Sequence, residues 1–197
     1  MSYCIPAERL SLAQQERLRG MADTMCRSRL AKKLVIDLSA ALNDQNPAVI
    51  CRDADYVVDF VPAANQAGLA GWLTQPMLAA GGFYSVFANN LGAPLTPIVL
   101  NNQEWVFYGI DILDADAAKE TVTQIRFGIG AAANRRAQFD LEGLYSGQAS
   151  SGYFSQPVWY DPQEIATVQV RARIPTGAGA RVRLMALIAE PVQQTVI

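Results

Sequence analysis

The stretch GYFSQPVWYDPQEIATVQVRARIP, Gly152 to Pro175, contains the pattern that decides the fold. From 166 to 174 apolar residues occupy the even positions and polar or charged residues occupy the odd positions. The polar set consists of Thr167, Gln169, Arg171 and Arg173. A period of two residues is the geometry of a β-strand, in which alternate side chains point to opposite faces. We therefore expect a strand with one face in a core and the other against water or a partner.

Short polar turns divide the second half of the chain into further segments of the same kind. The predicted strands are 105–112, 121–129, 137–145, 152–160, 165–174 and 181–191. Closely spaced strands with short polar connections indicate an antiparallel sandwich or barrel. The run YVVDFV at 56–61 is predicted to be another strand, and one or two more are expected within 62–104. With about eight strands, the sequence predicts a mainly β protein, an antiparallel β-sandwich of jelly-roll type.

A helical pattern occupies the region from Ser11 to Leu42, where apolar residues recur at intervals of three and four. Ser11 and Gln14 have the spacing of a capping box, which favours a helix start at this point. Asn46 precedes Pro47, and proline disfavours helical geometry in the residue before it. One long helix and two shorter helices, broken near 27–29, fit the pattern equally well.

These patterns predict three regions: an N-terminal helical segment at 1–47, a strand with a Gly/aromatic-rich connecting or arm segment at 48–104, and the sandwich at 105–197. The last two are expected to form one domain. Large aromatic residues lie between glycines in the middle region, namely Trp72, Phe83, Tyr84 and Phe87. A solvated linker would not carry so many aromatic rings, so we expect these residues to contact the sheet or a partner.

The composition predicts a protein of the cytoplasm that is not bound to membranes. Cys4, Cys26 and Cys51 are an odd number without paired spacing, which favours free thiols in a reducing compartment. The first ten residues have no apolar core of a signal peptide, and no apolar run reaches the length of a membrane span. The net charge of −2 gives the whole molecule no attraction for nucleic acid.

Common catalytic schemes are excluded or weakened by the residue types. The chain has no histidine, so Ser-His-Asp and Cys-His nucleophiles are impossible. Cys26 stands beside Arg27 and Arg29, which could lower its pKa, but a cysteine at an apolar helical position is more typical of packing. We therefore expect no enzyme activity.

The segment GIGAAA matches a dinucleotide-binding fingerprint through Gly128, Gly130 and Ala133. That fingerprint requires a following helix, whereas residues 137–145 alternate like a strand. We therefore predict a β-turn at this position, and we expect the protein to bind no cofactor.

A calcium site is a further possibility at Asp111, Asp114 and Asp116. The spacing of an EF-hand loop is missing, and a solvated turn explains the three residues as well. The 18 acidic residues also allow many imagined carboxylate pairs, none of which the spacing selects. We expect no metal.

Arg171 and Arg173 end one predicted strand, and Arg181 and Arg183 begin the next. If these strands form a hairpin, all four guanidinium groups share one face. Such a cluster requires acidic partners, either within the chain or on another protein. A subunit contact and a solvated outer face both remain open.

The region 105–191 resembles jelly-roll structural proteins of bacteriophages, such as minor capsid, decoration or head–tail accessory proteins. The likeness lies in the strand rhythm, in GYFSQPVWYDPQE leading into a long strand, and in the closing LIAEP. It implies a non-enzymatic, oligomeric virion component, made in the host cytoplasm, that acts in particle assembly or capsid stabilisation. Its partners would be copies of itself and other virion proteins. The helical N-terminus departs from a plain decoration domain, and no residue role is carried over.

Alternative functions follow from other features of the sequence. A carbohydrate- or receptor-binding module would use aromatic residues to stack on sugars, with Trp105, Tyr153, Trp159 and Tyr160 as candidates. A hydrolase is a third, weaker reading. Between residues 1 and 43 there are seven basic and four acidic residues, a modest attraction for phosphate that an ordinary solvated helix face explains better.

Overall fold

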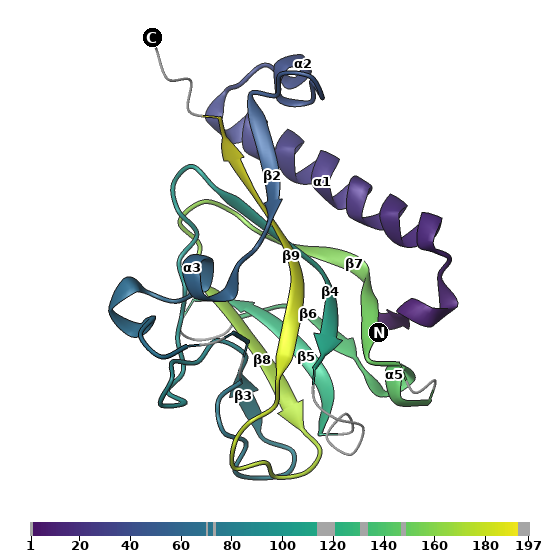
Figure 1. Ribbon diagram of the computed structural model, residues 1–197, viewed down its shortest axis with the longest axis vertical. Coiled ribbons are helices and arrows are strands. Elements are labelled where there is room, and N and C mark those ends of the chain that lie inside the picture. Colours follow the sequence, from purple (N-terminus) through teal and green to yellow (C-terminus); the bar gives the residue numbers. More distant parts are fainter. Residues whose placement is uncertain are drawn as a thin grey trace.

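The computed structural model describes residues 2–69, 71–72, 74–113, 121–130, 134–146 and 149–192. Within these ranges the chain forms one curled, mixed sheet of nine strands, with helices at its margins (Figure 1). The strands are β1 Ser2–Pro6, β2 Val49–Asp53, β3 Phe83–Ser85, β4 Glu104–Ile112, β5 Val122–Ile129, β6 Asn134–Asp140, β7 Ser151–Tyr160, β8 Ala166–Ala172 and β9 Val182–Pro191. The helices are η1 Ala7–Arg9, α1 Leu12–Leu34, α2 Leu38–Ala41, α3 Tyr56–Phe60, η2 Ala63–Asn65 and α5 Glu142–Ser146. The expectation of a mainly β protein is confirmed.

The strand order is β2-β9-β4-β7-β1-β6-β5-β8-β3, so the N-terminal strand lies in the middle. Ser2 and Tyr3 pair with β6 in parallel, whereas Cys4 to Pro6 pair with β7 in antiparallel orientation. β1 thereby joins two four-stranded halves. We call β2-β9-β4-β7 the helix-covered half and β6-β5-β8-β3 the open half. The expectation of a purely antiparallel sheet is wrong at the β1–β6 pair, and part of the predicted helical segment 1–47 belongs to the sheet.

Most strands lie where the alternating pattern predicts them. β4, β5, β7, β8 and β9 each begin or end within a few residues of the predicted bounds. The predicted strand 137–145 is only partly correct, because β6 ends at Asp140 and α5 follows. The Asp140 carboxylate accepts a hydrogen bond from the backbone N–H of Glu142 at 2.8 Å. This side-chain bond satisfies the backbone at the turn and ends the strand.

The predicted strand at 56–61 is wrong, because this segment forms the short helix α3. The Asp55 side chain caps the helix by accepting hydrogen bonds from the N–H groups of Val57 and Val58. Tyr56 and Phe60, one helical turn apart, are both buried. The cap and this buried pair outweigh the strand preference of the β-branched residues. The strand of this region is β2, which precedes the helix, and β3 is the strand described within 62–104.

The capping box at Ser11 and Gln14 is confirmed, with both reciprocal hydrogen bonds formed. The helical region contains two helices, but the break lies at Val35, which has a left-handed backbone with φ of 57°, and not near 27–29. α1 lies across the outer face of the helix-covered half (Figure 1). Its contact residues include Ala22, Cys26 and Leu30, which follow one another at intervals of four. Their modest size lets the helix approach the sheet closely.

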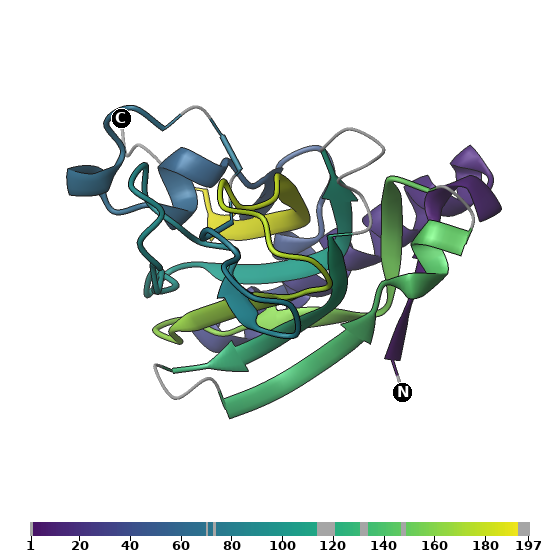
Figure 2. The ribbon, with the colours of Figure 1, turned by 90° about the horizontal axis from the view of Figure 1, so that it is seen from below.

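The two halves of the sheet face each other (Figure 2). Their inner faces enclose one core rich in aromatic side chains. Phe127 lies at its centre, with ring centroids 5.6 Å from Phe107, 6.0 Å from Phe139 and 5.4 Å from Phe154. Such edge and tilted contacts add to the free energy gained by burying the rings. In the described part of the chain, no helix combines the length and hydrophobicity that crossing a membrane requires.

The described part of the GIGAAA segment, residues 128–130, consists of the last two residues of β5 and Gly130, and β5 pairs with β6 in antiparallel orientation. Gly130 has φ of 75°, a conformation that suits glycine at a turn. Ala133 lies outside the described residues. The predicted β-turn falls partly on residues outside the described ranges. The next described element is the strand β6, whereas a dinucleotide-binding loop requires a helix at this point.

Gly152 allows β1 to approach β7, and its replacement by valine should therefore destabilise the protein. A Cβ at this position would lie 2.6 Å from both Cys4 Sγ and Leu144 Cδ2, and 3.0 Å from the backbone oxygen of Ile5. We expect Gly152→Val to lower the free energy of unfolding by at least about 2 kcal/mol, measured by urea denaturation. Gly20→Ala is the control, since a Cβ on this exposed helix position meets nothing within 4 Å. It should stabilise the protein by up to about 1 kcal/mol. Equal effects of both variants would contradict the role given to Gly152.

Candidate functional site

The four arginines predicted to share one face belong to separate parts of the sheet. β8 pairs with β5 and β3, whereas β9 pairs with β2 and β4, so β8 and β9 form no hairpin. Arg171 lies on β8 in the open half, and Arg183 lies on β9, where it binds Asp111 of β4. Arg173 and Arg181 lie in the connection between the two strands. The predicted hairpin is wrong because the chain crosses from one half of the sheet to the other between these strands.

The four aromatic residues predicted to contact a partner differ in exposure. Phe87 is completely buried, so its ring stabilises the core. Trp72 is half-buried against Tyr56, with ring centroids 4.6 Å apart. Phe83 and Tyr84 lie on β3, at one edge of the sheet, and both are half-buried. Of the predicted anchors, Phe83 and Tyr84 are therefore the best placed to meet another molecule.

A polar surface occupies the outer face of the open half. Arg126 of β5 pairs in register with Gln138 of β6 and Gln169 of β8, so the three side chains share one face. The Arg126 Nε donates a hydrogen bond to the Gln169 amide oxygen at 2.7 Å, and the guanidinium lies 3.7 Å from the centroid of the Phe83 ring. This contact holds Phe83 flat against the edge of the face. We call these residues, with Gln124, Asp140 and Arg171, the glutamine–arginine face.

A hollow of about 410 Å³ lies on the glutamine–arginine face and is lined by Ser2, Gln124, Arg135, Gln138 and Asp140. The Gln138 amide nitrogen donates a hydrogen bond to the Gln124 amide oxygen at 3.1 Å. The Gln138 amide oxygen is buried and accepts no hydrogen bond from the described residues. A buried acceptor without a donor is costly. The hollow could therefore bind a hydroxyl-rich or amide-bearing group.

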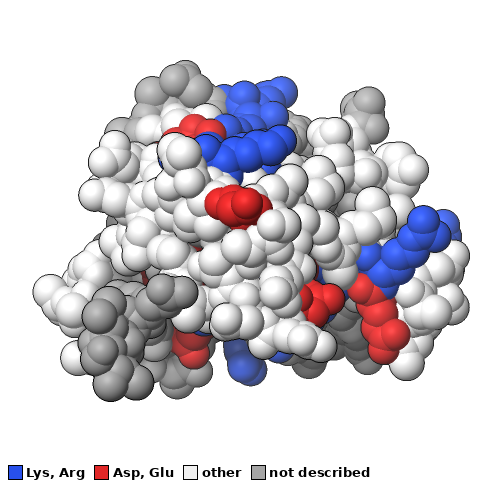
Figure 3. Space-filling model, turned by 90° about the horizontal axis from the view of Figure 1, so that it is seen from above, with Lys and Arg blue, Asp and Glu red and all other residues white. Residues whose placement is uncertain are grey.

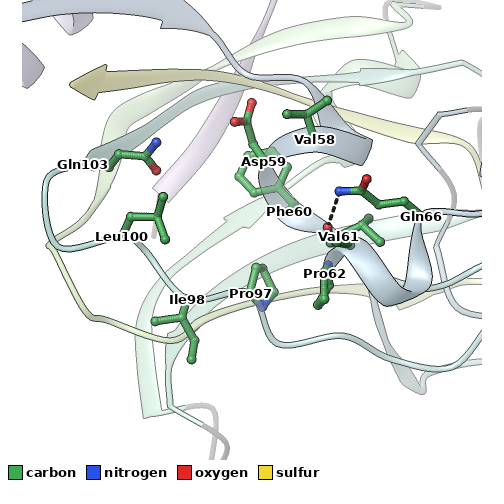
Figure 4. A pocket seen from close by; sticks show the side chains of 11 residues that line it. Val58, Asp59, Phe60, Val61, Pro62, Gln66, Pro97, Ile98, Leu100 and Gln103 are labelled. Atoms are coloured by element: carbon green, nitrogen blue, oxygen red, sulfur yellow. Dashed lines mark hydrogen bonds between the residues drawn. The ribbon is translucent and has the colours of Figure 1, made fainter. Parts of the chain in front are cut away.

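An apolar hollow of about 320 Å³ lies between α3 and the loop that precedes β4 (Figure 4). Phe60 and Val61 form its floor, and Pro62 and Pro97 line one side. Its rim consists of Val58, Ile98 and Leu100, whose exposed fractions are 69%, 56% and 58%. Exposed apolar side chains grouped around a hollow are typical of contact surfaces.

A charged cluster joins α1 to the sheet. The Glu104 side chain is completely buried and forms ion pairs with Arg29 and Lys33 of α1. Asp161, which follows β7, binds the same two cations, with Arg29 Nη2 to Oδ1 at 2.8 Å. The Arg29 guanidinium also lies 5.2 Å from the centroid of the Trp159 ring. Two carboxylates and two cations thus fix the helix over the sheet.

Both acidic groups of this cluster have shifted pKa values. Burial raises the pKa of Glu104 above its ordinary value, although Arg29 and Lys33 oppose the shift. Burial acts in the same direction on Asp161, but hydrogen bonds from Lys33 and Arg29 outweigh it and hold the pKa below its ordinary value. On the face of the molecule seen from above, acidic and basic side chains likewise lie in small groups on a largely uncharged surface (Figure 3). The ion pairs within the cluster balance its two negative charges with two positive ones.

Removal of both cations should destabilise the protein at neutral pH. In Arg29→Met/Lys33→Met, the Glu104 carboxylate would be buried without a partner, which we expect to cost about 3–5 kcal/mol. Both carboxylates would then have raised pKa values in the folded state, so the folded protein would bind protons more tightly than the unfolded chain. The loss relative to the original protein should therefore shrink as the pH falls from 7 to 5.

Denaturant unfolding across this pH range measures the effect. Adding Glu104→Gln to the double variant is the matched control, and it should remove much of the pH dependence. A loss of stability that does not change with pH would contradict a buried charge as the cause.

Other residues singled out by the sequence have structural partners. Cys26 is buried in the contact between α1 and the sheet, which confirms the packing role favoured by the sequence. Its pKa is raised, first by the neighbouring Cys51 and then by burial, so Arg27 and Arg29 do not activate its thiol. Asp111 binds Arg183, whereas Asp114 and Asp116 lie outside the described residues. Among the residues that the structure describes, no three acidic or cysteine side chains gather as a metal site would require.

The aromatic residues proposed for sugar stacking are mostly unsuitable for it. Trp105 and Tyr160 are buried in the core. Tyr153 is nearly buried and stacks on Tyr108, with centroids 6.2 Å apart. Trp159 is half-buried under Arg29. The four rings therefore form no common platform for a sugar.

Comparison with known proteins does not place the chain in a family. A scan against models of protein families gives no match. A search of curated proteins gives no similar sequence either.

Proposed function

We propose that the protein is a non-enzymatic virion structural protein with a jelly-roll fold, which acts in particle assembly or capsid stabilisation through subunit contacts. The observation that carries the proposal is the combination of nested strand pairing with a core of buried aromatic side chains between the two halves of the sheet. The resemblance of region 105–191 to bacteriophage structural proteins supplies the biological setting.

The strand pairing supports a jelly roll built from β2 to β9. The first of these strands pairs with the last, the second with the seventh, the third with the sixth and the fourth with the fifth. These pairs are β2–β9, β3–β8, β4–β7 and β5–β6. Rolling up one long antiparallel hairpin produces this nesting, which is the layout of the double Greek key found in viral capsid proteins, lectins and cupins. In this reading β1 and α1 are N-terminal additions.

The filled interior favours a function on the outside of the molecule. Enzymes and transport proteins built on closed β-structures place ligands in an interior cavity. Here that space contains Phe107, Phe127, Phe139, Phe154 and Tyr160, each at most 5% exposed. The chain has no histidine with which to hold a metal as many cupins do. These features favour a role for contacts between outer surfaces.

The apolar hollow is the surface best suited to a contact between copies. Its rim side chains, Val58, Ile98 and Leu100, have no polar partner, and their burial against a second copy would be favourable at about 25 cal/mol per Å². The edge strand β3, with the half-buried Phe83 and Tyr84, offers a second, weaker contact. Arg171 lies beside it and would make that contact sensitive to salt.

Light scattering coupled to size exclusion, over a range of concentrations, and electron microscopy of the purified protein test the proposal. We expect oligomers, and at least about tenfold weaker association for Ile98→Asp/Leu100→Asp, because both changes place charge in an apolar contact. Leu12→Asp is the matched control, since Leu12 is equally exposed but lies on α1 away from the hollow. A protein that stays monomeric at all concentrations and binds no particle would refute the proposal.

A carbohydrate-binding module is the second candidate, and the glutamine–arginine face favours it. Lectins share the jelly-roll layout. The buried, unpaired amide oxygen of Gln138 and the neighbouring hollow provide hydrogen-bonding groups of the kind that sugars require. The site differs from the aromatic residues expected from the sequence.

A glycan array distinguishes the two candidates. Binding that is lost in Gln124→Ala/Gln138→Ala, but retained in Ile98→Asp/Leu100→Asp, would support the carbohydrate-binding function. No binding to any glycan, together with oligomers that depend on the apolar hollow, would support the structural role.

A further inference from the structure

Two cysteines face each other where α1 lies on the edge of the sheet. The β2–β9 pairing places Cys51 opposite Ala189, and the β4–β9 pairing places Glu104 opposite the same residue. Residues directly opposite in neighbouring strands project from the same face, so these three side chains form one row beneath α1. The Cys26 thiol of α1 donates a hydrogen bond to the Glu104 backbone oxygen at 3.5 Å. Cys26 therefore lies above the Glu104 end of this row.

The Cys51 thiol, on β2, contacts α1 in the same interface. It donates a hydrogen bond to the backbone oxygen of Asp23, one turn before Cys26 on α1, at 3.7 Å. Cys51 is also the largest single cause of the raised pKa of the Cys26 thiol, as expected of neighbouring thiols. Ala189 between them has a side chain too small to separate the two sulfurs. The third cysteine, Cys4, is remote from this pair and packs at Gly152 of β7.

We propose that Cys26 and Cys51 form a disulfide when the protein meets a low-molecular-weight disulfide oxidant, and that this bond fastens α1 to the edge strand β2. All three cysteines are free thiols in the structure. The proposal rests on the contact between two elements and is independent of the proposed function. If the protein proves to be monomeric, the proposed function fails but the disulfide proposal still stands.

The chemistry is thiol–disulfide exchange in two steps. The half-buried Cys51 is the sulfur that an oxidant such as oxidised glutathione reaches first. Its thiolate attacks one glutathione sulfur, which forms a mixed disulfide and releases one glutathione thiolate. The buried Cys26 then attacks the Cys51 sulfur, loses its proton to the solvent or to the departing thiolate, and releases the second glutathione. Two protein thiols are oxidised and one glutathione disulfide is reduced to two thiols.

The bond would constrain the unfolded chain and stabilise the folded one. It closes the loop from residue 26 to residue 51, which includes α2 and the left-handed turn at Val35. Loop closure of this length should raise the midpoint of thermal unfolding by roughly 5–10 °C.

The test treats the full-length protein with oxidised glutathione at mildly alkaline pH and maps the peptides by mass spectrometry without reduction. We expect a peptide pair linked through Cys26 and Cys51, lighter by two hydrogen atoms, and a raised thermal midpoint that returns to its original value with dithiothreitol. Cys51→Ser should lose both effects, whereas Cys4→Ser, the matched control, should retain them.

Three results would overturn the proposal. One is glutathione that remains on Cys51 while Cys26 stays free, and another is a linkage that involves Cys4. The third is a Cys26–Cys51 linkage that lowers the thermal midpoint, because it would show that the native contact does not accommodate the bond. Since the peptide map of the unaltered protein decides between these outcomes, the test remains valid even if a serine variant fails to fold.

Discussion

The double pairing of β1 is the constraint on which the rest of the structure depends. Five residues join the helix-covered half to the open half, through parallel bonds to β6 on one side and antiparallel bonds to β7 on the other. β1 can pair closely with β7 because Gly152, which has no side chain, leaves space for Cys4. With the two halves connected, their inner faces can enclose a single aromatic core. Phe107, Phe127 and Phe139 are completely buried in this core, so the two halves of the sheet are packed against each other through aromatic side chains.

Local patterns predicted the strands well but did not predict their partners. Alternation of side chains between 165 and 174 is a property of neighbouring residues, and β8 lies where it was expected. Pairing depends on contacts between residues far apart in the chain. The rolled arrangement separates β8 from β9, although only a short connection lies between them, and this separation explains why the expected arginine hairpin does not form. β1 carried too few residues and no clear alternation to be recognised as a strand.

Side-chain capping explains the errors at the ends of elements. Asp55 and Asp140 each bind backbone N–H groups a few residues later and start short helices where β-branched or alternating residues suggested strands. The capping box at Ser11 was predictable because both of its residues lie within one turn. Glu104 and Cys51 gave no such signal. Their importance comes from partners on α1, which are 75 and 25 positions away in the sequence.

The two broad sides of the molecule are unlike. α1 lies along the helix-covered half, whereas no described helix covers the outer face of the open half, where glutamine and arginine side chains meet the solvent. A molecule whose two broad faces differ can be oriented in two distinguishable ways within an assembly. Copies joined edge to edge in the same orientation would form a sheet of molecules with a distinct front and back, and a closed shell built from such a sheet would automatically distinguish its inside from its outside.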